Sequence, residues 1–244
     1  FVANGVGDTC TVEPNVGMVE VPDERLAKLA DIVQPKKVVA AVVQFVDIAG
    51  LVKGAAEGEG LGNKFLANIR ETDAIVHVVR CFEDEDVTHV MGAVDPVRDR
   101  EVIEFELALS DLATVEKRLD KSRRTARTGD KEASAELPAL EKAYDFLKEG
   151  RGLWEAKLSA EENAVLAPLS LLTAKPVLYV CNVDEDAAAT GNALAAKVAE
   201  RARQEGAASV VISAKIEAEI AVLAPAERTE FLETIGLEEP GLNR

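Results

Sequence analysis

The sequence predicts an α/β fold, in which a mostly parallel sheet is flanked by helices and carries an inserted antiparallel helical hairpin. Two observations predict it. Apolar runs rich in β-branched residues show no polar alternation, as is typical of buried parallel strands; they lie at positions 38–46, 74–80, 176–181 and 210–212. Between the second and the third run, two heptad-like apolar stripes predict a pair of long helices.

Composition limits what the chain can be. Its 244 residues suffice for one large domain, or one core with a smaller appendage, and 48% hydrophobic residues can fill such a core. The net charge of −16 disfavours general binding to nucleic acid or to anionic membranes. Three widely spaced cysteines show neither metal spacing nor disulfide density, which favours a reducing cytoplasm. No apolar run reaches about 18 residues, and no signal peptide is visible, so we expect no membrane partner.

The run at 38–46 ends on Asp47 and opens into Gly50, which gives the pattern D-x-x-G. Before it, residues 11–17 predict a short extended piece and residues 22–30 a short helix. In nucleotide hydrolases such an aspartate holds Mg²⁺, directly or through water, and the glycine amide meets a γ-phosphate. The alternative is a core strand followed by a turn.

A glycine-rich segment follows this strand. Five glycines in residues 50–62 exclude a stable helix there. The segment is either a surface loop or one that orders and disorders, as switch loops do. A helix then restarts at Phe65 and leads into the run at 74–80. We therefore expect these two strands and the helix to form a right-handed βαβ unit.

The predicted hairpin has an apolar stripe on each helix and a polar tip. The stripes consist of Phe105, Leu109, Leu112, Val115 and Leu119, and of Leu137, Leu140, Tyr144 and Leu147. The basic residues near the tip are Lys117, Arg118, Lys121, Arg123, Arg124, Arg127 and Lys131, against two acids there. A solvent-exposed helix face is one explanation of this cluster of basic residues. Because the chain as a whole is acidic, the alternative explanation is a basic surface that binds RNA phosphates. No aromatic residues interleave with the basic ones, so base stacking is not expected.

Three predicted strands end in polar signatures, in a fixed order along the chain. They are Asp47-x-x-Gly50, then Asn182-Val183-Asp184-Glu185, then Ser213-Ala214-Lys215. The corresponding order in guanine-nucleotide hydrolases is D-x-x-G, N-K-x-D and S-A-K. There the asparagine and the carboxylate reach the base, and the Ser-Ala-Lys turn offers it a backbone N–H. The three signatures together predict a nucleotide site.

On these motifs the chain resembles the Obg-like ATPases, the YchF group of P-loop hydrolases. The resemblance covers nearly the whole chain; it is carried by residues 11–15, 45–54, 58–70, 78–83 and 236–244. It implies a P-loop-type core formed by residues 1–100 and 166–244, the latter with a C-terminal linker, and a hairpin inserted at 101–165. It also implies Mg²⁺-dependent hydrolysis of ATP to ADP, with GTP bound more weakly, and a setting on ribosomes or RNA. We expect a cytoplasmic monomer.

The resemblance assigns individual roles. Asn182 to Glu185 is similar to the family's N-x-x-E, which replaces N-K-x-D. The extra methylene of Glu185 shifts its oxygens by about 1.5 Å and spoils the bidentate grip on guanine. Val183 would pack on the purine, Thr11 would help Asp47 hold Mg²⁺, and His89 would serve the attacking water. The second histidine, His77, lies inside a predicted strand and is expected to be a core residue.

The chain departs from the family in what surrounds these motifs. It has no G-x-x-x-x-G-K-[ST], the loop that cradles phosphates with backbone amides and a lysine. Residues 1–9 do not fit the family's aromatic-proline stretch, and relatives continue past Arg244 into a β-rich TGS domain. We therefore expect a fragment of a longer enzyme. The rival interpretations are a GTPase of the same superfamily and a nucleotide-independent ribosome-binding module.

Overall fold

The computed structural model describes residues 15–47, 61–87, 89 and 92–243. Its strands are β1 (Asn15–Glu20), β2 (Val42–Asp47), β3 (Ile75–Arg80), β4 (Val177–Asn182) and β5 (Ala208–Ile212). Its α-helices are α1 (Glu24–Val33), α2 (Leu61–Arg70), α3 (Pro96–Ala126), α4 (Lys131–Lys148), α5 (Ala160–Leu166), α6 (Ala193–Glu205), α7 (Ala214–Val222) and α8 (Pro225–Thr234). Short 3₁₀ turns are η1 (Leu153–Glu155), η2 (Ala167–Leu169), η3 (Leu172–Ala174) and η4 (Gly241–Asn243).

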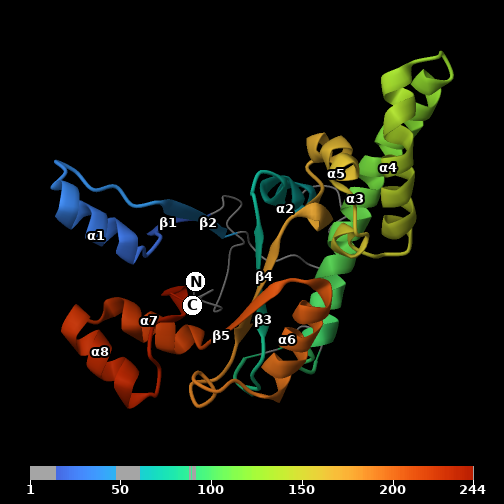
Figure 1. Ribbon diagram of the computed structural model, residues 1–244. Helices are drawn as coiled ribbons and strands as arrows, with labels where there is room; N and C mark the ends of the chain where they lie inside the picture. The colour runs from blue at the N-terminus through green and yellow to red at the C-terminus, as the bar shows by residue number, and fades with distance from the viewer. Residues whose placement is uncertain (1–14, 48–60, 88, 90–91, 244) are drawn as a thin grey trace.

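The central sheet has the order β3-β4-β5, and both strand pairs are parallel, as the sequence predicts (Figure 1). One of its faces is covered by α6. The core on that side contains Val79, Tyr179 and Cys181 from the strands and Val198 and Ala202 from the helix. Alternation along each strand directs these residues to one side, so this face is the well-packed one.

The opposite face of the central sheet is exposed at β3 among the described residues. Val76 is 42% exposed and Val78 is 52% exposed, although parallel strands are normally covered on both faces. The prediction that the run at 74–80 is buried on both sides is therefore wrong for β3. β4 matches its prediction better, because Tyr179, Val180 and Cys181 are all buried.

The strand that ends in Asp47 belongs to a separate two-stranded sheet. β2 pairs with β1 in an antiparallel register that places Asn15 opposite Asp47. It is shorter than the predicted 38–46 run, and Val42 and Val43 are each 46% exposed. In the described part of the chain β2 does not pair with β3, so the expected βαβ unit is not formed there. The apolar run does not distinguish the two kinds of sheet, because β-branched residues favour both.

The predicted hairpin is confirmed and projects away from the sheet (Figure 1). Its core includes Val115 and Leu119 of α3 and Leu140 and Leu147 of α4. Phe105, predicted to belong to the stripe, is 49% exposed. In this part of α3 the side chains of Arg100 and Glu104 contact Glu205 and Tyr179. α3 is one continuous helix from Pro96, so it runs through the predicted boundary between residues 100 and 101. No helix among the described residues is long and apolar enough to cross a membrane.

The base of the hairpin is fixed to the core by polar contacts. Asp111 of α3 is fully buried and accepts hydrogen bonds from the backbone N–H groups of Leu172 and Thr173, at 2.9 and 2.7 Å. Arg70, the last residue of α2, donates to the Ser110 hydroxyl at 2.9 Å and lies 3.6 Å from the Asp111 carboxylate. These bonds join α2, α3 and η3, so the hairpin does not emerge from a loose linker.

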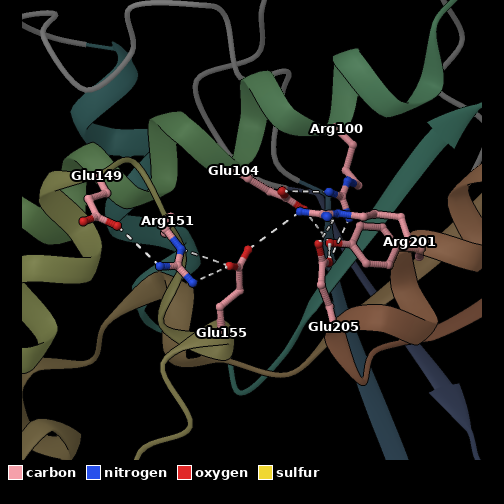
Figure 2. Close-up of polar contacts among 8 residues, drawn as sticks. Arg100, Glu104, Glu149, Arg151, Glu155, Arg201 and Glu205 are labelled. Atoms are coloured by element: carbon pink, nitrogen blue, oxygen red, sulfur yellow. Dashed lines mark hydrogen bonds and ion pairs between the residues drawn. The ribbon is translucent and has the colours of Figure 1, made fainter.

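A chain of ion pairs runs between α3, α6 and the segment after the hairpin (Figure 2). Its buried centre is Arg100, whose guanidinium lies 2.8 Å from Glu205 and 3.2 Å from Glu104. From Glu205 the chain continues to the partly exposed residues Arg201, Glu155, Arg151 and Glu149. The phenol of Tyr179 donates to Glu104 at 2.6 Å, which connects the network to β4.

Candidate nucleotide site

The ends of β4 and β5 bring two of the three polar signatures together. Asn182 is paired with Ile212 across the strands, and the N–H of Val183 donates to the carbonyl of Ile212 at 2.8 Å. Just beyond, the side-chain Oδ1 of Asn182 accepts a hydrogen bond from the N–H of Ala214 at 2.9 Å. Asn182 and the Ser213-Ala214-Lys215 turn therefore form one site at the carboxyl edge of the sheet, where α/β sheets bind ligands.

Ser213 and Ala214 mark the transition from β5 to α7. Ser213 is the residue before the helix and is 2% exposed, and its hydroxyl has no hydrogen-bond partner among the described residues. Ala214 begins α7, and its N–H is held by Asn182. The orientation of the Asn182 amide is thereby fixed: Oδ1 faces the turn, and the Nδ2 hydrogens donate to none of the described residues. An amide group held in this way is a preorganised donor.

Glu185 forms an ion pair with Lys215, so the last residues of the two signatures contact each other. Both side chains are largely exposed, at 44% and 70%. The hydrogen bond from Lys215 lowers the pKa of Glu185 below its usual value, which keeps the carboxylate ionised. The intervening Asp184 has a local role, because its carboxylate accepts from the N–H of Ala187 at 2.9 Å and stabilises the turn.

Val183 lies in a different place from the one expected. Its side chain is 2% exposed and belongs to the core between β4 and α6. The expectation that it packs on a purine is therefore not met in this structure. The physical reason is the alternation along the strand, which directs Asn182 and Val183 to opposite sides.

The phosphate and metal end of the site is only partly described. Asp47 is exposed at the end of β2, whereas Thr11 and Gly50 lie outside the described residues. Among the described residues no three His, Cys, Asp or Glu side chains form a metal-binding group. The assignments of Thr11, Asp47 and Gly50 to metal and γ-phosphate stay predictions.

The two histidines have different surroundings. His89 follows β3 in a loop that Arg80 stabilises, because its guanidinium donates to the carbonyls of Asp84 and Val87 at 3.2 and 3.0 Å. The His89 ring lies 2.7 Å from the carboxylate of Asp99 in the first turn of α3. His77 packs near the Tyr179 ring, with centroids 5.7 Å apart. Burial, with the charge of Arg100 nearby, lowers the pKa of His77 to about 4, as suits a neutral core residue.

The basic tip of the hairpin is partly neutralised by its own helices. Arg123 lies 3.0 Å from Glu141, and Arg118 lies 2.7 Å from Glu136, so both pair across the hairpin. Five exposed residues form no ion pair with the rest of the described chain; they are Lys117, Lys121, Arg124, Arg127 and Lys131. We call these five the free tip cations. Arg123, one of the predicted nucleic-acid contacts, is thus a weaker candidate than Lys121, Arg124 and Arg127.

Two features of the site were missed by reasoning from the sequence. One is the partner of His89, Asp99, which is marked only by its position in the first turn after the helix cap Asp95-Pro96. The other is Asn192, whose amide donates to the carbonyl of Cys81 at 2.7 Å and fixes the end of β3 beside β4. Neither residue belongs to a motif, so only the folded geometry identifies it.

The chain is similar to known proteins along nearly its whole length. Residues 7–118 match the family model described as 50S ribosome-binding GTPase. The chain is 52% identical over 235 residues to the ribosome-binding ATPase YchF of Escherichia coli O157:H7 and 48% identical over 237 residues to that of Bacillus subtilis. It is similar to the solved structure of the Schizosaccharomyces pombe YchF GTPase, with 34% identity and a TM-score of 0.80. The matches to these three relatives each cover 96% of this chain, but only 64%, 65% and 64% of the respective relative.

Proposed function

We propose that this chain, a homologue of the YchF proteins over 96% of its length, contributes the base-binding and hairpin parts of an ATP-hydrolysing, ribosome-binding protein. The observation that carries the proposal is the hydrogen bond between Asn182 and Ala214. It joins the N-x-x-E and Ser-Ala-Lys segments, which are far apart in the sequence, into one site. The relatives named as ribosome-binding ATPases support the same activity.

The site favours adenine over guanine because of Glu185. An aspartate at this position would grip guanine with both oxygens, and the added methylene of glutamate displaces the carboxylate by about 1.5 Å. The ion pair with Lys215 also engages one oxygen of Glu185. Asn182 can donate its Nδ2 hydrogens to a ring nitrogen of either purine, so it supports binding without selecting the base.

Catalysis would be mostly positioning and electrostatics. The oxygen of a water bonds to the γ-phosphorus, the bridging P–O bond breaks, ADP leaves with the electron pair, and the water protons end on phosphate and solvent. His89 would orient that water. Asp47, with Thr11, would hold Mg²⁺, since an exposed carboxylate at a strand end offers the oxygen ligand that this ion prefers. When bound, the ion neutralises charge on the phosphates.

Base selection is tested by the Glu185→Asp variant in the longest natural form of the protein. We expect it to shift the ratio of GTP to ATP affinity at least tenfold toward GTP, because the N-x-x-D geometry is restored. Competition of the two nucleotides against a fluorescent analogue measures the ratio. Glu230→Asp, an exposed change on α8, is the matched control and should leave the ratio unaltered. An unmodified protein that binds GTP tenfold more tightly than ATP would contradict the proposal.

The hairpin tip is the surface we assign to RNA, on ribosomes in the cytoplasm, with the protein acting as a monomer. The free tip cations stand out in a chain with a net charge of −16. Binding through n phosphate contacts gives a salt dependence that rises with n. The test replaces Lys121, Arg124 and Arg127 together by glutamate and measures ribosome co-sedimentation at two salt concentrations.

We expect this triple variant to lose at least tenfold in affinity and to show a smaller salt slope. The control carries the same change of charge at Lys36, Lys37 and Lys197, which are exposed and lie outside the hairpin. Equal losses in the tip variant and the control would mean that net charge, and not the tip, governs binding. Unchanged co-sedimentation of the tip variant would exclude the hairpin as the contact surface.

A further inference from the structure

The ion pair between Lys215 and Glu185 lies at the edge of the proposed base site. Glu185 follows β4, Lys215 is in the first turn of α7, and Lys215 Nζ donates to Glu185 Oε1. Hydrogen bonds from Lys215 and from its own backbone N–H lower the pKa of Glu185. The bond to Glu185, with smaller contributions from the charges of Asp84 and Glu219, raises the pKa of Lys215. Both groups are therefore charged at neutral pH, and the carboxylate already has donors within the protein.

The second group that the guanine signature uses is engaged as well. The N–H of Ala214 donates to Oδ1 of Asn182 at 2.9 Å, so its hydrogen is already directed at a protein acceptor. Guanine presents O6 as an acceptor and N1–H and N2–H₂ as donors, whereas adenine has no polar donor at N1 or C2. Contacts within the protein thus occupy both the N–H that would meet O6 and the carboxylate that would meet N1–H and N2–H₂. Adenine needs neither group.

We infer that Lys215 is a positioning residue that sets base selectivity: it keeps the Glu185 carboxylate occupied, so that this carboxylate does not accept hydrogen bonds from guanine. A site can reject a ligand by leaving the polar groups of that ligand without partners. The N1–H and N2–H₂ groups of guanine would lose water and meet an occupied acceptor, which weakens GTP binding and leaves ATP binding unaffected. The inference rests on the proposed function, because it places the purine beside Asn182 and Glu185. It adds a second source of selectivity, separate from the length of the Glu185 side chain.

The test is the Lys215→Met variant in the longest natural form of the protein, with ATP, GTP and ITP in competition against a fluorescent analogue. We expect the ratio of GTP to ATP affinity to rise about threefold, the size that loss of an exposed ion pair allows. The lost charge weakens binding of all three triphosphates alike, so the ratio isolates the base. ITP lacks the N2 amino group, so its affinity relative to ATP should rise less than that of GTP. Lys215→Arg retains a donor to Glu185 and should keep the ratio, and Lys197→Met, an exposed change on α6, is the control.

Two further measurements separate the inference from the proposed function. In a Glu185→Ala background, Lys215→Met should leave the ratio unchanged, because the acceptor is gone. Without any nucleotide, ¹³C NMR titration should show a higher pKa of the Glu185 carboxyl in Lys215→Met than in the unmodified protein, with the signal assigned by its absence in Glu185→Ala. An unchanged ratio in Lys215→Met, an equal shift in the Glu185→Ala background or an unchanged Glu185 titration would overturn the inference and leave the proposed function standing. If the unmodified protein binds GTP tenfold more tightly than ATP, the proposed function fails, and the inference fails with it even where the titration agrees.

Discussion

Replacing Glu104 by glutamine should make the stability of the protein less sensitive to a rise in pH through the range from 5 to 8. Glu104 is mostly buried, with its side chain 14% exposed, and it lies between Arg100, 3.2 Å away, and the Tyr179 hydroxyl, 2.6 Å away. Burial raises the pKa of Glu104 from 4.5 to about 7, and the charge of Glu205 adds to this, whereas Tyr179 and Arg100 act in the opposite direction. At neutral pH the folded protein therefore holds a carboxylate that would be more easily ionised in the unfolded chain.

The sign and size of the effect follow from linkage. Between pH 4.5 and pH 7 the folded state binds more protons than the unfolded state at this group, so stability falls as pH rises through this window. With pKa values of 4.5 unfolded and about 7 folded, the contribution to the free energy of unfolding declines by about 2.5 kcal/mol between pH 5 and pH 8. Glutamine has no proton to lose, so the Glu104→Gln variant lacks this decline.

The assay is urea unfolding of the unmodified protein and the variant at pH 5 and at pH 8. The free-energy difference between the two proteins should move by about 2.5 kcal/mol in favour of the variant at the higher pH. Comparison at the same pH cancels other titrating groups. Glu101→Gln, exposed on the same helix, should show no such movement. A Glu104→Gln difference that is the same at both pH values would refute the reasoning from burial.

Three further predictions concern stability. Asp111→Ala should lower the free energy of unfolding by at least about 2 kcal/mol, because two buried backbone N–H groups lose their acceptor. Asp120→Ala, an exposed change on the same helix, is the control and should change it little. Chemical denaturation measures both values. Leu140→Ala should lower the free energy of unfolding by about 2 to 5 kcal/mol, because it opens a cavity in the hairpin core. Denaturation followed by circular dichroism measures this loss, and a smaller loss would show that the core closes around the cavity. Burial lowers the pKa of His77 to about 4, so between pH 6.5 and pH 4 this histidine is protonated in the unfolded state but not in the folded state. Stability therefore falls as the pH falls through this window. The melting temperature of the unmodified protein should decrease more there than that of the His77→Phe variant. Equal decreases in the melting temperatures of the two proteins would contradict the interpretation of His77 as a neutral core residue.

Much of the fold follows from local pattern. The stripe that includes Val115 and Leu119 predicts the hairpin because its spacing matches one face of a helix, and such contacts depend on near neighbours in sequence. For the run that forms β2, the same kind of pattern predicts the wrong kind of sheet. Its pairing with β1, and not with β3, is a long-range choice that propensity does not encode.

The candidate site was predictable where a signature ends a strand. Asn182 and Ser213 meet because parallel neighbours end at one edge of the sheet. Val183 was misplaced because the motif names a position but not the face to which the strand directs it. The ion pair of Glu185 with Lys215 and the contact of His89 with Asp99 depend on loop geometry, which no local pattern specifies.

The continuity of α3 has a mechanical consequence. The helix has 31 residues, about 46 Å, with its one proline in the first turn and no glycine, so nothing in its sequence acts as a joint. Asp99 lies at one extremity and Arg124 near the other. A rod of this length converts one degree of tilt about its foot into about 0.8 Å of travel at its far end. A partner that tilts α3 from its far end therefore also tilts the turn that carries Asp99, the contact of His89.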